Sequence, residues 1–263
     1  MSQNRMPALF IGHGSPMNAI ENNQFTKGWD EMGARLAALP QRPRAIVAVS
    51  AHWTTRTFAV RTAPKNRQVN DMYGFPKALY EIHYEPAGDP QLAQRIIDAA
   101  HGAVSEDNTW GIDHGVWTPL HRMYPKADVP VVPVSVAPEL PTKAHFELGR
   151  TLRELRDEGF LVIGSGNVVH SFKYVNPGLE DGLSLWAQEA DAAVRDAVTS
   201  GAWDQVVDYR SFGPAIRKAF QTPEHYLPLP AVLGAAHEDE PVEVWNEGGQ
   251  LGSFSMTSYA FGL

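Results

Sequence analysis

Histidines placed after strand-like runs are the residues of this sequence best suited to chemistry. His13 follows the apolar residues 8–11 after a single glycine, and His52 follows residues 45–50 after a single alanine. A third such run leads through a glycine-rich exit to His170. Imidazole is the commonest metal ligand in proteins and transfers protons near neutral pH. The repeated pattern therefore predicts a metal or acid–base site.

Small residues beside His13 and His52 indicate that a metal or a substrate can approach both imidazoles. Gly12 and Gly14 flank His13, and Ala51 precedes His52. Ligands gathered from the ends of several strands would make a compact site. The alternative is that both histidines only cap their strands through hydrogen bonds. The context that they share favours the metal site.

Two further histidines have neighbours that suit a functional role. His225 follows Glu224 in residues 222–230 (TPEHYLPLP). Either side chain could bind a metal, or Glu224 could only complement the dipole of a helix that starts there. His114 follows Asp113 in a polar, glycine-marked loop. A loop histidine is a candidate proton donor or acceptor, although adjacent side chains such as these two often diverge.

The remaining histidines carry weaker signals. His83 lies among aromatic residues that could form the wall of a pocket. Four others occupy helical or loop contexts without special neighbours, which favours structural or surface roles: His101, His121, His145 and His237. The glycine-rich residues 164–170 lack the Lys-Ser/Thr ending of a P-loop and the spacing of a dinucleotide fingerprint, so a phosphate site is not favoured.

Composition narrows the class of protein. The 263 residues carry a formal net charge of −8 and no run of Lys or Arg, which argues against a nucleic-acid partner. Cysteine is absent, so disulfides and thiolate ligands are excluded. Residues 1–7 lack the apolar region of a signal peptide, and no apolar stretch approaches the ~20 residues of a membrane-spanning helix. A cytoplasmic protein with no membrane partner is expected.

Helical and strand-like patterns alternate along the chain. This alternation predicts one α/β domain over residues 1–263, with a central mixed, largely parallel sheet flanked by helices on both faces. Ligands of such sheets bind beyond the carboxyl ends of the strands, where His13 and His52 are expected. Helices are expected over residues 25–39, 90–100, 142–158 (capped by Thr142) and 183–200, and strands over residues 57–61, 129–135, 242–245 and 253–259.

A few boundaries decide the setting of the histidines. The strand over residues 45–50 is expected to end before His52. One helix is expected to begin near Thr118, which leaves His114 in a loop, and another to cover residues 226–235. Residues 62–89 read as a long loop, and loops of this length inside a compact domain are often functional.

Several motifs taken together resemble the class III (LigB-type) extradiol ring-cleavage dioxygenases, in particular the branch of DOPA 4,5-dioxygenases with its bacterial relatives. The motifs are residues 12–16 (GHGSP), 50–53 (SAHW), 111–115 (GIDHG), 166–170 (GNVVH) and 222–229 (TPEHYLPL). Residues 73–76 (YGFP) and 78–80 (ALY) also fit that branch. The resemblance extends from residue 6 to about residue 260. Ordered motifs in one chain are more specific than any one of them.

The resemblance implies a single α/β domain with a metal centre formed by His13, His52 and His225. His170 matches a position that is either a fourth ligand or a base beside the metal. His114 matches a histidine that contacts substrate or oxygen. The implied reaction is extradiol cleavage of a DOPA-like catechol by O₂, which opens the aromatic ring. The implied partners are therefore a small aromatic diol and O₂.

The third ligand position affects which metal is expected. The wider class uses the two-histidine, one-carboxylate triad of non-haem Fe(II). Here that position reads as His225 with Glu224 beside it. Fe(II) is expected for activity, although an all-histidine site also suits Zn(II).

Two other functions are weighed against the dioxygenase. A zinc-dependent hydrolase would use a metal-bound water to attack an ester or amide. A non-catalytic scaffold would keep the fold and the metal site without the chemistry. The complete set of histidines and the aromatic loop around Tyr73 favour an enzyme.

Overall fold

A central sheet organises the fold. The computed structural model describes residues 5–263. The first four residues of the predicted domain (1–263), and of residues 1–7 that lack a signal-peptide pattern, lie outside the described range. Within the described range, eight strands form one sheet in the order β4-β3-β5-β2-β6-β1-β10-β7. Their bounds are β1 Ala8–Gly12, β2 Ile46–Thr54, β3 Phe58–Val60, β4 Val104–Glu106, β5 Val131–Val136, β6 Leu161–Gly166, β7 Val242–Trp245 and β10 Ser258–Phe261. A small antiparallel pair, β8 Gly249–Gln250 with β9 Phe254–Ser255, lies apart from it.

The middle of the sheet is parallel and its margins are mixed. β5, β2, β6 and β1 pair in parallel, whereas β10 runs antiparallel to both β1 and β7. At the other margin, β3 is antiparallel to β5 and parallel to β4. The mixed, largely parallel sheet expected from the sequence is confirmed.

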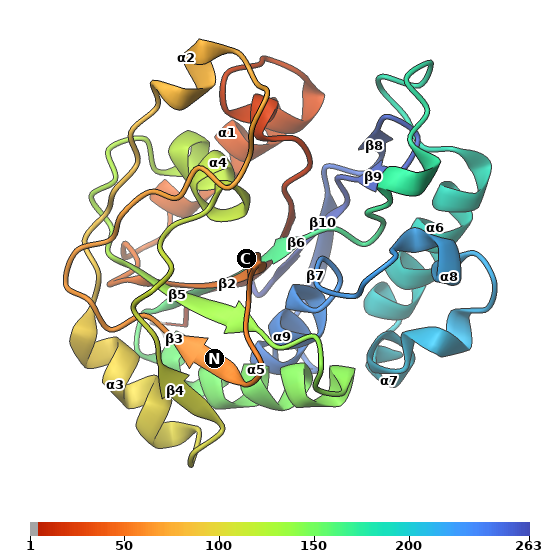
Figure 1. Cartoon of the computed structure of the whole chain (residues 1–263). Helices are drawn as coiled ribbons and strands as arrows, with labels where there is room; N and C mark the ends of the chain where they lie inside the picture. Colours follow the sequence, from red (N-terminus) through yellow and green to blue (C-terminus); the bar gives the residue numbers. More distant parts are fainter. Residues whose placement is uncertain (1–4) are drawn as a thin grey trace.

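Helices cover both faces of the sheet because its central strands are apolar on both sides. In β1, Leu9 and Ile11 join the core under α1 and α4, while Phe10 joins the core under α5 and α9. Figure 1 shows these two pairs of helices on opposite sides of the sheet. The helices are α1 Gln24–Ala37, α2 Lys77–Tyr80, α3 Pro90–Ala99, α4 His114–Met123, α5 Thr142–Asp157, α6 Leu185–Thr199, α7 Trp203–Val207, α8 Ile216–Ala219 and α9 Pro228–Ala235, with short 3₁₀ turns η1 Pro16–Ala19, η2 Phe172–Tyr174 and η3 Tyr209–Phe212.

Glycines set the approach of α5 and α9. A Cβ atom added at Gly149 of α5 would lie 1.9 Å from the carbonyl oxygen of Ala231. A Cβ atom at Gly234 of α9 would lie 2.0 Å from the carbonyl oxygen of Phe146. Two backbones this close leave no room for any side chain at either position. The closely packed helix pair supports the face of the sheet opposite α1 and α4.

Two boundaries next to site histidines differ from the sequence prediction. β2 continues past Ser50, because after an irregular register Thr54 pairs with Val136. His52 therefore lies inside the strand and not beyond it. α4 begins at His114 and not near Thr118. The helix runs through Pro119, and the predicted start is too late because Gly115 and the polar residues before it favour a loop.

Smaller differences concern helix and strand ends. Thr142 is the first residue of α5, which follows Pro141 and has no side-chain cap. α9 begins at Pro228, so His225 precedes this helix and does not start it. The single strand expected over residues 253–259 is divided into β9 and β10, which pair with different strands. No helix in the described part of the chain is both long enough and apolar enough to cross a membrane.

Candidate metal centre

Three histidines from distant parts of the chain meet at the carboxyl ends of the parallel strands. His13 directly follows β1, His52 lies near the end of β2, and His225 precedes α9. Their ligand atoms all lie within 4.8 Å of one another. The Nε2 atom of His52 is 3.1 Å from that of His13 and 3.3 Å from that of His225.

The spacing of these nitrogens fits a metal ion. Metal–nitrogen bonds of about 2.1 Å at octahedral or tetrahedral angles separate two ligand nitrogens by about 3.0 to 3.4 Å. Three Nε2 atoms this close to one another cannot all be paired by hydrogen bonds among themselves. Each neutral imidazole has one N–H donor and one acceptor nitrogen, so a ring whose Nδ1 donates has only a lone pair at Nε2. The donor set therefore suits a divalent cation that prefers imidazole.

Each of the three rings is held at its other nitrogen. The Nδ1 atom of His13 lies 3.0 Å from Ser165 Oγ. The Nδ1 atom of His52 lies 3.1 Å from an Asp71 carboxylate oxygen, and that of His225 lies 3.2 Å from Glu224. Such partners fix the tautomer and leave the Nε2 lone pair free for a metal. Glu224 therefore contacts His225 and is absent from the three-nitrogen group.

The Ser165 contact can be traced to a proline. Pro119 has no backbone N–H, so in α4 the carbonyl oxygen of Gly115 lacks its usual helical donor. The Ser165 hydroxyl donates to that carbonyl oxygen instead. Because its proton is committed there, Ser165 Oγ accepts the hydrogen bond from His13 Nδ1. Gly115 also lies close to the rings, since an added Cβ would be 2.8 Å from His52 Cδ2.

Two other histidines border the three-nitrogen group. His114 is the first residue of α4, and its ring centroid lies 4.0 Å from that of His52. Its Nδ1 atom is 2.9 Å from Asp71. The ring of His170 stacks on that of His225, with centroids 3.5 Å apart and planes 3° from parallel.

The protonation state of the imidazoles follows from burial and from Asp71. Burial, together with the charge of neighbouring histidines, lowers the pKa of His13, His114 and His225 and lowers that of His170 to about 3. Burial also acts to lower the pKa of His52, but the Asp71 hydrogen bond and nearby carboxylates outweigh it and raise the pKa. Neutral imidazole is the form that binds metals. A bound cation would oppose the protonation of His52.

Asp113 does not pair with His114. Its carboxylate, which is 1% exposed, accepts hydrogen bonds from Ser50 Oγ at 2.8 Å and from Trp110 Nε1 at 2.9 Å. His114 is paired with Asp71, a residue of the loop between β3 and α2. Adjacent residues in the sequence thus serve separate networks.

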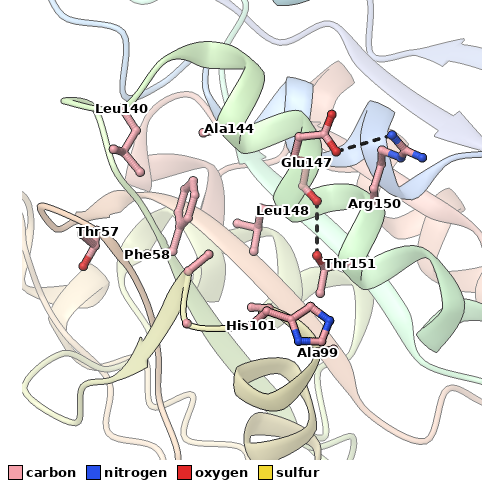
Figure 2. A pocket seen from close by; sticks show the side chains of 13 residues that line it. Thr57, Phe58, Ala99, His101, Leu140, Ala144, Glu147, Leu148, Arg150 and Thr151 are labelled. Carbon is pink, nitrogen blue, oxygen red and sulfur yellow. Dashed lines mark hydrogen bonds and ion pairs between the residues drawn. The ribbon is translucent and has the colours of Figure 1, made fainter.

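The described structure also has a hollow that lies away from the histidine cluster. A hollow of about 770 Å³ lies between β3, the end of α3 and α5, with Phe58, Leu148 and Arg150 in its lining. Figure 2 shows that His101 is the histidine at this hollow. None of the five site histidines lines it. The candidate metal centre is therefore identified by its side chains and not by this hollow.

Comparison with known proteins identifies the family of this chain. A family model described as the catalytic LigB subunit of aromatic ring-opening dioxygenase matches residues 7–262. This chain belongs to the LigB family. Its members are extradiol ring-opening dioxygenases, which are oxidoreductases that incorporate O₂, and the resemblance drawn from the motifs is confirmed.

Relatives of this LigB-family chain match it over nearly its full length. A 4,5-DOPA dioxygenase extradiol of Escherichia coli (strain K12) is 43% identical, with 100% of this chain and 97% of the relative covered. A protein of the same name from Beta vulgaris is 37% identical over 96% of this chain and 95% of the relative. A crystal structure of uncharacterized protein JW3007 from Escherichia coli K12 has a TM-score of 0.82 at 40% identity, covering 97% of this chain and 99% of that one.

The structure brings together the five histidines singled out by sequence in this LigB-family chain. His13, His52 and His225 form a group that could hold a metal, and His114 and His170 contact its rings. Sequence reasoning missed Asp71 and Ser165, which hold two of the rings. The long polar loop that carries Asp71 and the Gly-Ser-Gly strand exit that carries Ser165 were the available signals.

Proposed function

We propose that this LigB-family chain cleaves the ring of a DOPA-like catechol with O₂, at a divalent metal held by His13, His52 and His225. The observation that carries the proposal is the convergence of three Nε2 atoms, each on a ring whose Nδ1 has a hydrogen-bond partner. The relatives named 4,5-DOPA dioxygenase extradiol supply the substrate class.

The metal we propose for activity is Fe(II), which when bound supplies sites for the diol oxygens and O₂ and the redox chemistry of ring opening. Glu224 takes part through the Nδ1 atom of His225. A carboxylate in this position orients the imidazole and increases its basicity. The three-histidine set also suits Zn(II) as a bound metal.

His170 acts, in this proposal, as an acid–base group beside the metal. The lone pair of an imidazole nitrogen lies in the plane of its ring. The rings of His170 and His225 are nearly parallel with centroids 3.5 Å apart, so the lone pair of His170 lies in a plane displaced from that of His225. This geometry supports a role in proton transfer with substrate for His170 rather than a fourth place among the ligands.

His114 is the proposed acceptor of the first catechol proton. Its Nδ1 faces Asp71, so Nε2 keeps its lone pair and can accept a proton.

An aromatic side chain beside His170 could contact the substrate. Phe172 is 74% exposed and its ring centroid lies 5.1 Å from that of His170. Exposed aromatic rings beside the imidazoles suit contact with an aromatic substrate.

The test uses protein loaded with Fe(II) under anaerobic conditions and then given DOPA, catechol or protocatechuate in air. We expect O₂ uptake and a yellow ring-opened product from at least one of them. His13→Ala and His52→Ala should abolish both signals, while the wild-type protein loaded with Zn(II) should give neither. Turnover of an ester or amide without O₂ would favour the hydrolase, and wild-type protein inert toward every catechol would refute the proposal.

A further inference from the structure

Asp71 is the one carboxylate in the described structure that bonds to two of the site histidines at once. One of its oxygens lies 3.1 Å from Nδ1 of His52. The other lies 2.9 Å from Nδ1 of His114 and accepts the backbone N–H of His114 at 3.0 Å. The Asp71 side chain is 11% exposed, so little water competes for these contacts.

The chemistry of a carboxylate fixes how both rings are protonated. An ionised carboxylate only accepts hydrogen bonds, so each Nδ1 that it contacts must carry a proton. Each Nε2 then keeps its lone pair, which on His52 is directed at His13 and His225. Although burial acts to raise it, the pKa of Asp71 is held below its ordinary range by hydrogen bonds from His114 and His52, which keeps the carboxylate ionised.

The contact between Asp71 and His114 lies at the N-terminus of α4, where a positively charged imidazole would otherwise be disfavoured. The N-terminus of a helix carries positive charge from its dipole, which disfavours an imidazolium there. Asp113 precedes His114 but makes no cap hydrogen bond, because its carboxylate is committed to Ser50 and Trp110. Asp71 instead accepts the backbone N–H of His114 and places a negative charge beside its ring.

We propose that Asp71 is a positioning residue that aligns a metal ligand, His52, and a proton acceptor, His114, through one carboxylate. The role assigned to His114 rests on the proposed function. In that step the O–H bond of a catechol hydroxyl breaks, an N–H bond forms at His114 Nε2, and the resulting imidazolium faces Asp71. The loop between β3 and α2 thereby sets the geometry of two histidines that lie outside it.

The test compares three variants of the full chain. Asp71→Asn keeps the size of the side chain but offers one acceptor oxygen, so it cannot accept from both rings. Glu224→Gln removes the carboxylate from His225 alone. Glu85→Gln is the matched control, because Glu85 accepts a backbone N–H from Gln68 in the same loop and contacts no site histidine. Circular dichroism checks that each variant is folded.

Two readouts do not depend on turnover. Titration with Co(II), followed by visible absorption, should show dissociation constants raised ~10–100-fold in Asp71→Asn and Glu224→Gln, and unchanged in Glu85→Gln. Nitrogen NMR of the Zn(II)-loaded, ¹⁵N-histidine protein should show His114 protonated at Nδ1 in the wild type and in Glu224→Gln. In Asp71→Asn the Nε2-protonated form of His114 should appear.

The outcomes separate this inference from the proposed function. Wild-type His114 protonated at Nε2 would overturn the inference without any variant, even if Asp71→Asn failed to fold. Co(II) affinity in Asp71→Asn within twofold of the wild type would also overturn it. Wild-type protein without catechol turnover would remove the proton-acceptor role of His114, whereas the alignment of His52 would still stand on affinity and the tautomer of His114 on NMR.

Discussion

Hydrogen-bond partners decide what each histidine can do. His13, His52 and His225 differ from the structural His145, whose Nε2 accepts the backbone N–H of Ala137 and therefore has no lone pair to offer. In the three candidate ligands, Nδ1 meets an oxygen and Nε2 faces the other imidazoles. The candidate ligands thus differ from the structural histidine in that no backbone donor occupies their Nε2 atoms.

Replacement of His170 tests its role directly. His170→Gln should retain the wild-type affinity for Co(II), because the ring of His170 is stacked on that of His225 and the lone pairs of the two rings lie in separate planes. With saturating Fe(II), kcat should fall ~10²–10⁴-fold, the range for loss of a general acid or base. A matching loss of Co(II) affinity would instead identify His170 as a ligand.

Ionisation of Asp191 should lower the free energy of unfolding as the pH rises. Burial raises the pKa of this carboxyl to about 6, although hydrogen bonds from Ser255 and Thr257 act to lower it. A folded-state pKa above the ordinary value of 3.8 means that the native state binds the proton more tightly. Its contribution to stability is therefore complete below about pH 4 and is lost as the pH rises toward 6, by about 3 kcal/mol.

Asp191→Asn isolates this contribution, because asparagine does not ionise. Urea unfolding of the metal-free wild type and variant at pH 4, 5, 6 and 7 should show the variant gaining relative stability with rising pH. Contributions from the buried histidines cancel in the difference between the two proteins. A difference that stays constant over this range would contradict the assignment.

At the scale of a single element, the helical hydrogen bond that is missing at Pro119 of α4 helps to orient His13. Pro119 leaves the carbonyl oxygen of Gly115 free for Ser165, and Ser165 in turn accepts from His13. A regular helix would donate to that carbonyl from residue 119. The break in the helical hydrogen bonds is therefore part of how His13, a candidate metal ligand, is oriented.

Pro119→Ala restores a competing N–H and should separate stability from metal binding. We expect equal or greater resistance to urea, since an interior proline costs a helix ~3 kcal/mol. Affinity for Co(II) should fall by up to ~10-fold, as for other changes behind a ligand. Ser165→Ala, which removes the hydroxyl itself, should show at least as large a loss. Unchanged affinity in both variants would disprove the link.

At the scale of the whole molecule, a buried ion pair connects segments that are far apart in the sequence. The side chains of Arg156 and Glu240 are 0% and 1% exposed, with N–O distances of 2.7 and 2.8 Å. Arg156 also donates to the carbonyl oxygens of Met6 and Ala235 at 2.8 and 2.7 Å. The pair therefore connects the segment before β1 with α5, the end of α9 and the chain leading into β7.

Removal of one partner should be costly because the other charge stays buried. Glu240→Ala should lower the free energy of unfolding by about 3–5 kcal/mol. Glu243→Ala is the control, since the Arg35–Glu243 pair is 45% and 53% exposed and should contribute at most about 1 kcal/mol. Urea unfolding of both variants measures the contrast, and similar losses in the two would contradict it.

The sequence by itself singled out the histidines that meet at the candidate site and predicted the kind of sheet that carries them. Alternating strand and helix patterns, with His13 and His52 at strand ends, predict a parallel sheet with a site at one edge. The same patterns placed the start of α4 too late and ended β2 too early, because periodicity reports local backbone preference and register depends on the neighbouring strand.

Only the tertiary structure decided how those histidines are used. The pairing of Asp71 with His52 and His114, of Ser165 with His13, and the stacking of His170 on His225 join positions far apart in the chain. No spacing rule predicts such contacts, since they depend on how segments that are distant in the sequence pack together. The orientation of a lone pair is set by a partner across the fold, so the sequence indicates the candidate ligands and the packing decides how they are oriented.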